Sequence, residues 1–246
     1  MEIHKFPISK GAAINEISGA EKKPQVFWIG IRMMCCNEHA KKVFAEQADM
    51  RIVFWYLTAF QQVGGIERFN RAFMKALSDI ALQRRDIIFQ ARSVYDQAPD
   101  EKYISKNIWK GFGGNRLGFA FHVWRHCKKR DIIIAGHIHL IPIVCLVKIF
   151  HPSCRVIYIT HGIEVWKPMS KWKRHLLQRA DKILAVSEYT KKQLIDKQKI
   201  NASKIEILPN TLDPYFHLSK ETGKPESLLH KYGLGAQDKI LLSICR

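Results

Sequence analysis

A pair of glycines, Gly64-Gly65, separates the apolar run Arg51–Leu57 from an amphipathic segment that begins at Ile66. The run is typical of a buried strand, and the segment after it has helical spacing. At such a junction the first backbone N–H groups of the helix are uncovered, and together with the helix dipole they favour binding of a phosphate or a polar sugar. Glycine has no Cβ, so the ligand can approach the backbone closely. The spacing matches neither G-x-G-x-x-G nor a P-loop. An ordinary strand-to-helix turn would explain the glycines equally well.

Strand-like and helix-like segments alternate from residue 50 onward. This alternation predicts an α/β fold, a Rossmann-like parallel sheet with helices on both faces. The expected strands are Arg51–Thr58, Asp86–Gln90, Asp131–Ala135, Arg155–Thr160, Lys182–Val186 and Ile205–Leu208. The expected helices are 66–80, Leu117–Lys129, Lys171–Arg179 and Glu188–Lys197, the last with Ser187 as its N-cap.

Polar residues follow several of these strands, where a parallel sheet binds its ligands. They are Gly64-Gly65, His137, Thr160-His161-Gly162, Ser187 and Asn210. His161 is expected to project from the carboxyl edge of the sheet rather than into the core. His137 could equally be a polar residue that ends a strand, and Glu164 could face the same edge or the solvent.

Four motifs in order carry a family resemblance: Val63-Gly-Gly-Ile-Glu-Arg68, Thr160-His-Gly-Ile-Glu164, Val186-Ser-Glu-Tyr-Thr-Lys-Lys192 and Leu208-Pro-Asn-Thr-Leu-Asp213. Together they resemble the amino-terminal half of a GT-B glycosyltransferase, of the retaining, metal-independent group called glycosyltransferase family 4. The resemblance covers about residues 50–246. It implies an enzyme whose first half binds the acceptor and whose second half binds most of the nucleotide-sugar donor.

The resemblance also implies roles for individual residues. Gly64 and Gly65 match the glycine loop near the donor phosphates and the acceptor, and His161 matches the cleft histidine that contacts the transferred sugar. Ser187 and Asn210 match positions that line the cleft. Arg246 matches the arginine that helps to clamp the donor diphosphate.

The same resemblance divides the chain into three parts. Residues 1–49 have no match and are expected to be an unassigned, poorly packed amino-terminal extension. Residues 50–218 are expected to be the acceptor-side domain, and residues 219–246 a linker and the first strand of a second domain, the rest of which is expected to be missing. The chain is therefore expected to be truncated and inactive alone. A complete enzyme would transfer a sugar to a glycan or lipid-linked acceptor in cell-surface polysaccharide synthesis, without metal or cofactor.

The composition leaves other functions open. A net charge of +18, of which residues 1–49 carry only +1, attracts polyanions such as nucleic acid, anionic lipid or phosphorylated substrates. A nucleic-acid-binding module would need stacking aromatics interleaved with basic residues or a helix-turn-helix, and neither is evident, so no nucleic acid is expected as a partner. A nonfunctional truncated remnant is the other alternative.

Cellular location follows from two further features. The six cysteines show no C-x-x-C and no metal-ligand spacing, which favours reduced thiols in the cytoplasm. The apolar stretch 132–150 contains two histidines, a proline and a lysine, and is expected to be a strand, a turn and a short helix rather than a membrane span. A basic segment with Trp166, Lys171, Trp172, Lys173, Arg174 and Arg179 is either a solvated helix or a peripheral contact with the anionic inner membrane face.

Overall fold

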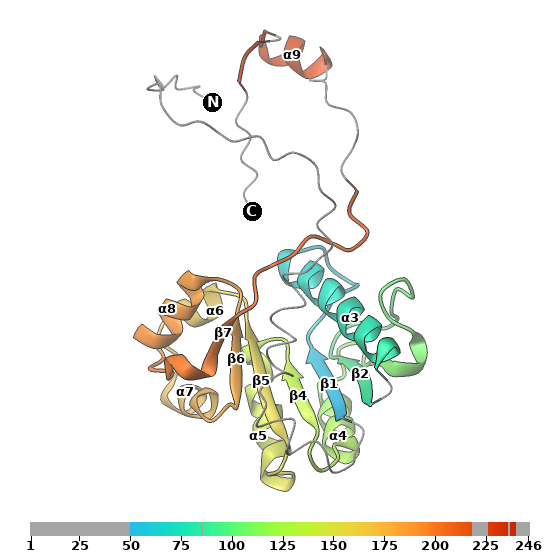
Figure 1. The fold of residues 1–246 in the computed structure, drawn as a ribbon, viewed down its shortest axis with the longest axis vertical. Helices are drawn as coiled ribbons and strands as arrows, with labels where there is room; N and C mark the ends of the chain where they lie inside the picture. Colours follow the sequence, from blue (N-terminus) through green and yellow to red (C-terminus); the bar gives the residue numbers. More distant parts are fainter. Residues whose placement is uncertain (1–49, 85, 218–225, 236, 240–246) are drawn as a thin grey trace.

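The structure, a computed structural model, describes residues 50–84, 86–217, 226–235 and 237–239. The expectations for residues 1–49 and for Arg246 lie outside the described residues. The described strands form one parallel sheet of seven strands in the order β3-β2-β1-β4-β5-β6-β7 (Figure 1). Their bounds are β1 Met50–Tyr56, β2 Ile87–Ser93, β3 Trp109–Gly111, β4 Ile132–Ala135, β5 Arg155–Thr160, β6 Lys182–Ala185 and β7 Ile205–Ile207.

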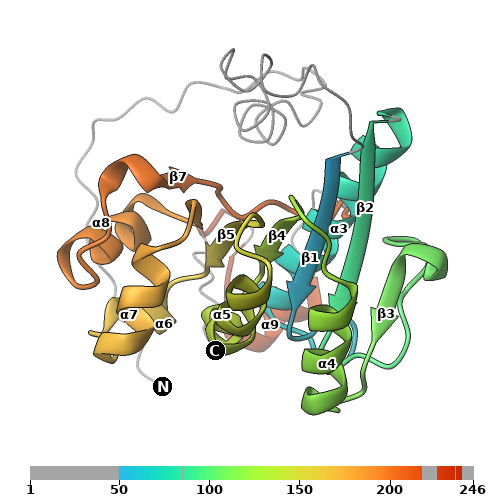
Figure 2. The ribbon, with the colours of Figure 1, turned by 90° about the horizontal axis from the view of Figure 1, so that it is seen from below.

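Helices cover both faces of this sheet, as the sequence predicts. Figure 2 shows α3 on one side of it and α4, α5, α6 and α7 on the other. The helices are α3 Gly65–Gln83, α4 Arg116–His126, α5 Ile141–Phe150, α6 Ile163–Trp166, α7 Lys171–Gln178, α8 Glu188–Asp196 and α9 Glu226–Tyr232.

The central strand β1 explains why the core has two layers. Val53 and Trp55 face the layer that contains α4 and α5, whereas Phe54 and Tyr56 face the layer that contains α3. All four side chains are at most 4% exposed. A strand buried on both faces needs an unbroken apolar run, and this is the pattern that the sequence carries there.

Most predicted elements are confirmed, with small shifts at their ends. Helix α4 ends at His126 rather than Lys129, because Cys127 is extended and the Asp131 carboxylate accepts the Lys128 N–H at 2.8 Å. Strand β2 extends three residues beyond Gln90 and pairs with β3, a short edge strand that the sequence pattern did not reveal. The apolar stretch 132–150 folds as strand β4, a turn and helix α5, as expected. In the described part of the chain, no helix has both the length and the apolar content that crossing a membrane requires.

The order of the strands marks where a ligand would bind. The chain moves from β1 to β2 and β3 on one side, then returns to β4 on the other side of β1. In doubly wound sheets the crevice above such a reversal, at the carboxyl ends of the strands, is the usual ligand site. Here it lies between the loop after β1 and the loop after β4.

Candidate functional site

Five side chains converge beside this reversal and are called the strand-end cluster: Glu67, Phe69, His137, His161 and Glu164. The first two lie near the start of α3, and His137 follows β4. His161 follows β5, and Glu164 lies on α6. The two imidazole rings are 6.3 Å apart, and the His161 ring meets Phe69 edge to face at 5.1 Å. Residues from three segments, those that follow β1, β4 and β5, thus meet in one place.

His161 is held by the backbone of the neighbouring strand. Its Nε2 lies 2.9 Å from the Gly136 carbonyl oxygen. Because a carbonyl only accepts, Nε2 must carry the proton, and Nδ1 of the neutral ring is left as an acceptor. Gly136 is required for this approach, since a Cβ there would lie 2.8 Å from the Phe54 ring.

The turn after β5 fixes the same histidine from the other side. Gly162 has φ of +138°, a conformation that favours glycine, and a Cβ there would lie 3.0 Å from the Trp166 ring. This turn lets the Glu164 carboxylate accept the backbone N–H of His161. Glu164 therefore faces the cluster rather than the solvent, which settles the alternative that the sequence left open.

Burial sets the charge of the two histidines. It lowers the pKa of His161, against the opposing effects of the Gly136 carbonyl, Glu164 and Glu67. Burial, with His139 nearby, lowers the pKa of His137 to about 4. Both rings are therefore neutral at pH 7. A neutral His161 that presents Nδ1 beside two carboxylates offers acceptors to the hydroxyl groups of a sugar.

The His137 pKa predicts how stability depends on pH. Its folded-state pKa of about 4 is below the unfolded value of about 6.5, so the unfolded state binds more protons between these pH values. Stability is therefore fully present above pH 6.5 and is lost as the pH falls towards 4. In His137→Asn, the free energy of unfolding should fall on the order of 2–3 kcal/mol less between pH 6.5 and 4, because asparagine does not titrate there. Asparagine still offers an acceptor for the His139 N–H. Urea unfolding of both proteins at several pH values measures the difference, and parallel pH curves would contradict the prediction.

The other predicted site residues lie along the same edge but outside the cluster. Gly64 is the N-cap of α3, and a Cβ on it would lie 2.2 Å from a Glu67 carboxylate oxygen. Gly65 begins α3 with nothing within 4 Å of its Cβ position. Asn210 follows β7 and is exposed. The site roles of these residues, and that of Arg246 beyond the described residues, stay predictions.

Ser187 has a structural role, whatever else it does. Its hydroxyl accepts the Thr190 N–H at 3.1 Å and lies 3.0 Å from the Thr190 hydroxyl, so it caps α8 as predicted.

Ser187→Ala should therefore lower the free energy of unfolding by about 1 kcal/mol. Ser170→Ala is the matched control, because Ser170 is the N-cap of α7 and makes no side-chain cap hydrogen bond. Denaturant unfolding of both variants measures the difference. Equal losses at the two positions would contradict the assignment.

Sequence patterns did not reveal Asp96, which holds the loop after β1. The side chain is fully buried, and its carboxylate accepts five hydrogen bonds. The donors are the hydroxyls of Thr58 and Ser93, each at 2.8 Å, and the backbone N–H groups of Ala59, Phe60 and Gln61 at 2.9–3.1 Å. The loop that leads to Gly64 is thus built around one carboxylate. The signal was Ser93-x-x-Asp96 at the end of β2, which became readable only once β2 was known to reach Ser93.

The basic segment around α7 is partly packed. The Trp166 indole meets the Tyr189 ring at 5.1 Å and lies 3.4 Å from the Thr190 hydroxyl, so it is anchored to α8. Trp172 is half exposed, with the Lys173 ammonium over its ring. The three cysteines in the described residues are free thiols, of which Cys127 and Cys154 are buried. Among the described residues, no three His, Cys, Asp or Glu side chains are grouped to hold a metal ion.

Comparisons with solved structures identify the fold. A glycosyltransferase from Rickettsia africae matches with 15% identity and a TM-score of 0.50, over 77% of this chain and 51% of its own. HepE from Anabaena, solved in complex with UDP, matches with 17% identity and a TM-score of 0.49, over 75% of this chain and 50% of its own. The chain thus spans about half the length of these structures. No curated protein sequence matches it.

The sequence itself identifies the family. The profile described as Glycosyltransferase Family 4 matches residues 63–216, which is well over half of the chain. This range begins beside Gly64-Gly65 and includes every residue of the strand-end cluster. The chain belongs to glycosyltransferase family 4.

Proposed function

We propose that this chain supplies the acceptor side of a retaining sugar transfer, from a nucleotide-sugar donor to a glycan or lipid-linked acceptor. The strand-end cluster carries the proposal, because it presents neutral His161 at the carboxyl edge of the sheet. The Nδ1 atom of that ring has no hydrogen-bond partner among the described residues. The expected placing of His161 in a cleft, and not in the core, is consistent with this half-buried position.

The proposed role of His161 is to orient the transferred sugar. A sugar hydroxyl would donate a hydrogen bond to Nδ1, while Nε2–H stays on the Gly136 carbonyl. Such a contact can strengthen as positive charge develops on the sugar in the transition state. Glu67 and Glu164 lie close enough to affect the His161 pKa, and their carboxylates could accept further hydroxyl groups of the ligand.

Transfer also requires that the leaving diphosphate be stabilised, and preorganised charge is usually the largest catalytic contribution. In the family that this chain resembles, an arginine and a lysine of the second half supply that charge without metal or cofactor. We propose that Arg246 is this arginine and that the lysine lies on a donor-binding domain. The proposed setting is cell-surface polysaccharide synthesis at the cytoplasmic face of the membrane.

The isolated chain is therefore expected to bind acceptor but not to transfer sugar. Nuclear magnetic resonance of the imidazole nitrogens, with a panel of acceptor fragments, should show the His161 signal shifting on binding and the His139 signal staying in place. Incubation with nucleotide sugars and a lipid-linked acceptor should give no turnover.

Other outcomes favour the other functions. No acceptor binding by the folded chain would favour a nonfunctional remnant. Tight binding of an oligonucleotide at physiological salt, with no acceptor binding, would favour a nucleic-acid module. Turnover by the isolated chain would overturn the need for a donor domain.

A further inference from the structure

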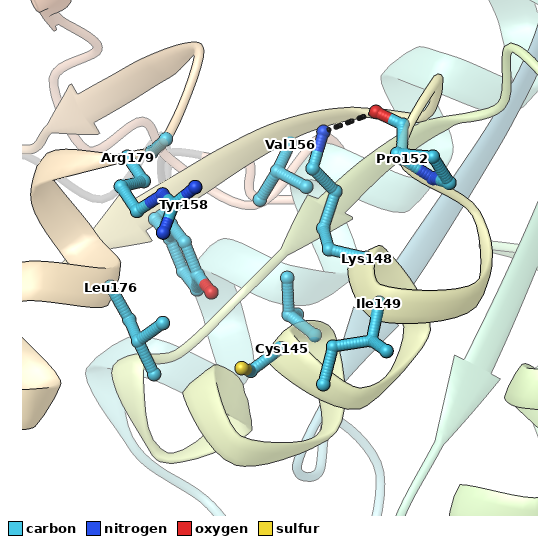
Figure 3. Close-up of a pocket in the computed structure, with 10 residues that line it drawn as sticks. Cys145, Lys148, Ile149, Pro152, Val156, Tyr158, Leu176 and Arg179 are labelled. Atoms are coloured by element: carbon cyan, nitrogen blue, oxygen red, sulfur yellow. Dashed lines mark hydrogen bonds between the residues drawn. The ribbon is translucent and has the colours of Figure 1, made fainter.

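A pocket of about 430 Å³ lies between α5 and α7, and its size falls within the range of small-molecule sites (Figure 3). Its lining includes Val156, the second residue of β5, whereas His161 follows the last residue of that strand. The pocket therefore lies towards the amino ends of the strands, away from the strand-end cluster. None of its ten lining residues is acidic, and most are apolar.

Tyr158 contributes a hydroxyl group to this pocket. Its side chain is only 2% exposed, and its hydroxyl makes no hydrogen bond to any described residue. Burial raises the pKa of Tyr158, so the hydroxyl stays protonated and able to donate. The hydroxyl oxygen is not among the buried side-chain atoms that lack a partner, so it is open to the pocket. A ligand oxygen in the pocket would accept its hydrogen bond.

Two cations line the same pocket. Figure 3 shows Lys148 approaching the pocket from α5, and Arg179 lying next to Tyr158 at the end of α7. The Lys148 ammonium donates to the carbonyls of Pro152 and Cys154 at 2.9 and 2.6 Å, which leaves its third N–H available. Arg179 is exposed and forms no ion pair with any described residue. An anion beside Tyr158 would thus meet the Arg179 guanidinium, and the fixed Lys148 ammonium adds positive charge at the Pro152 end of the pocket.

An exposed apolar strip continues from the same pocket. Ile149 lines the pocket yet is 68% exposed, and its neighbour Phe150 is 57% exposed. The Phe150 ring contacts Trp124 of α4 at 5.6 Å, and Trp124 contacts Phe121 at 5.8 Å. A hydrocarbon chain leaving the pocket over Ile149 would therefore meet further apolar surface.

The charge of the surrounding segment suits an anion. Residues 116–181 contain twelve Lys and Arg residues and three carboxylates, of which Asp181 accepts the backbone N–H of the pocket residue Val156 at 2.7 Å. Asp131 is 1% exposed and paired with Arg51, and Glu164 is bonded to the backbone N–H of His161. Neither Asp131 nor Glu164 opposes an anion at the pocket, and cations outnumber carboxylates in this segment twelve to three.

We propose that this pocket binds an anionic amphiphile, with its phosphate or carboxylate held by Arg179 and the Tyr158 hydroxyl, Lys148 adding positive charge to the pocket, and its hydrocarbon chain lying over Ile149. This chemistry is shared by membrane phospholipids and by free alkyl phosphates. In either case the ligand would occupy a second site, at the end of the sheet opposite the proposed sugar site.

Cys145 allows a direct test, because it lines the pocket and is partly exposed. The probe is decyl phosphate below its micelle concentration, and the readout is the rate of Cys145 alkylation by N-ethylmaleimide, followed by peptide mass spectrometry. Decyl phosphate should slow the reaction at least about fivefold, and decanol or inorganic phosphate less than about twofold. Equal protection by decanol, or no protection by decyl phosphate, would overturn the proposal.

Two variants make the test specific. Tyr158→Phe and Arg179→Gln should each weaken the protection by about tenfold in apparent Kd without lowering the melting temperature. Tyr158→Phe removes a hydroxyl with no described partner, so folding is not at risk. Lys171→Gln is the control, since it removes the same charge from α7 at an exposed residue outside the pocket. If Lys171→Gln weakens protection as much as Arg179→Gln does, protection depends only on the overall positive charge of the protein, and the proposal fails.

Vesicle sedimentation separates the two sources of the ligand. Binding to phosphatidylglycerol vesicles but not to phosphatidylcholine vesicles, weakened by Arg179→Gln, would assign the pocket to a membrane lipid. Protection by decyl phosphate without sedimentation would assign it to a free amphiphile. Absence of both would contradict the proposal.

Discussion

His161→Ala is expected to lower kcat/KM by about 30- to 1,000-fold in an enzyme built on this chain and a family 4 donor domain. The physical reason is the loss of one oriented acceptor in a water-poor site, which costs on the order of 2–4 kcal/mol of transition-state stabilisation. The side chain also bonds Gly136 and packs on Phe69, so the free energy of unfolding should fall by about 1 kcal/mol. Steady-state kinetics and thermal unfolding of the same samples measure both effects.

His139→Ala is the matched control for this prediction. His139 is exposed, and its hydrogen bond to His137 uses only the backbone N–H, which alanine keeps. It should therefore retain kcat/KM within about twofold. If His161→Ala melts several degrees lower but keeps near-normal kcat/KM, His161 is structural and the proposed sugar contact is wrong.

Asp96→Ala should give the largest loss of stability, about 3–5 kcal/mol. The substitution leaves five donors in a buried site without their acceptor, and each unpaired donor costs free energy. Because those donors include three consecutive backbone N–H groups of the loop before Gly64, hydrogen exchange should rise in residues 58–61 first. Denaturant unfolding and exchange mass spectrometry measure the two effects.

Asp79→Ala provides the comparison, since it removes a carboxylate that pairs with Lys75 on the exposed face of α3. An exposed pair of this kind contributes about 0.3–0.5 kcal/mol. A loss at Asp96 no larger than the loss at Asp79 would show that the buried carboxylate does not organise the loop.

The sheet could be predicted from the sequence because the patterns that mark its strands and helices are local in the chain. An unbroken apolar run such as that of β1 marks a strand buried on both faces, and Ser187 before an amphipathic segment marks a helix start. The edge strand β3 has only three residues, of which none is fully buried, so it carries no such pattern. Its existence depends on pairing with β2 and not on its own residues.

The site was predictable only in part, for a similar reason. His161 and His137 could be placed at strand ends, because the strands before them were clear. The groups that hold His161 could not be predicted in this way. The Gly136 carbonyl and the Phe69 ring reach His161 only after β4, β5 and α3 have packed. Asp96 was missed because four of its five donors lie 35 to 38 residues away in the loop after β1.

The stereochemistry of sugar transfer tests the central proposal most directly. The chain, joined to a family 4 donor domain, would be incubated with nucleotide sugars and a lipid-linked acceptor, and the anomeric configuration of the product determined by nuclear magnetic resonance. Retention of the donor configuration, abolished by His161→Ala and unaffected by His139→Ala, is the predicted result. An inverted product, or a retained product formed equally well without His161, would contradict it.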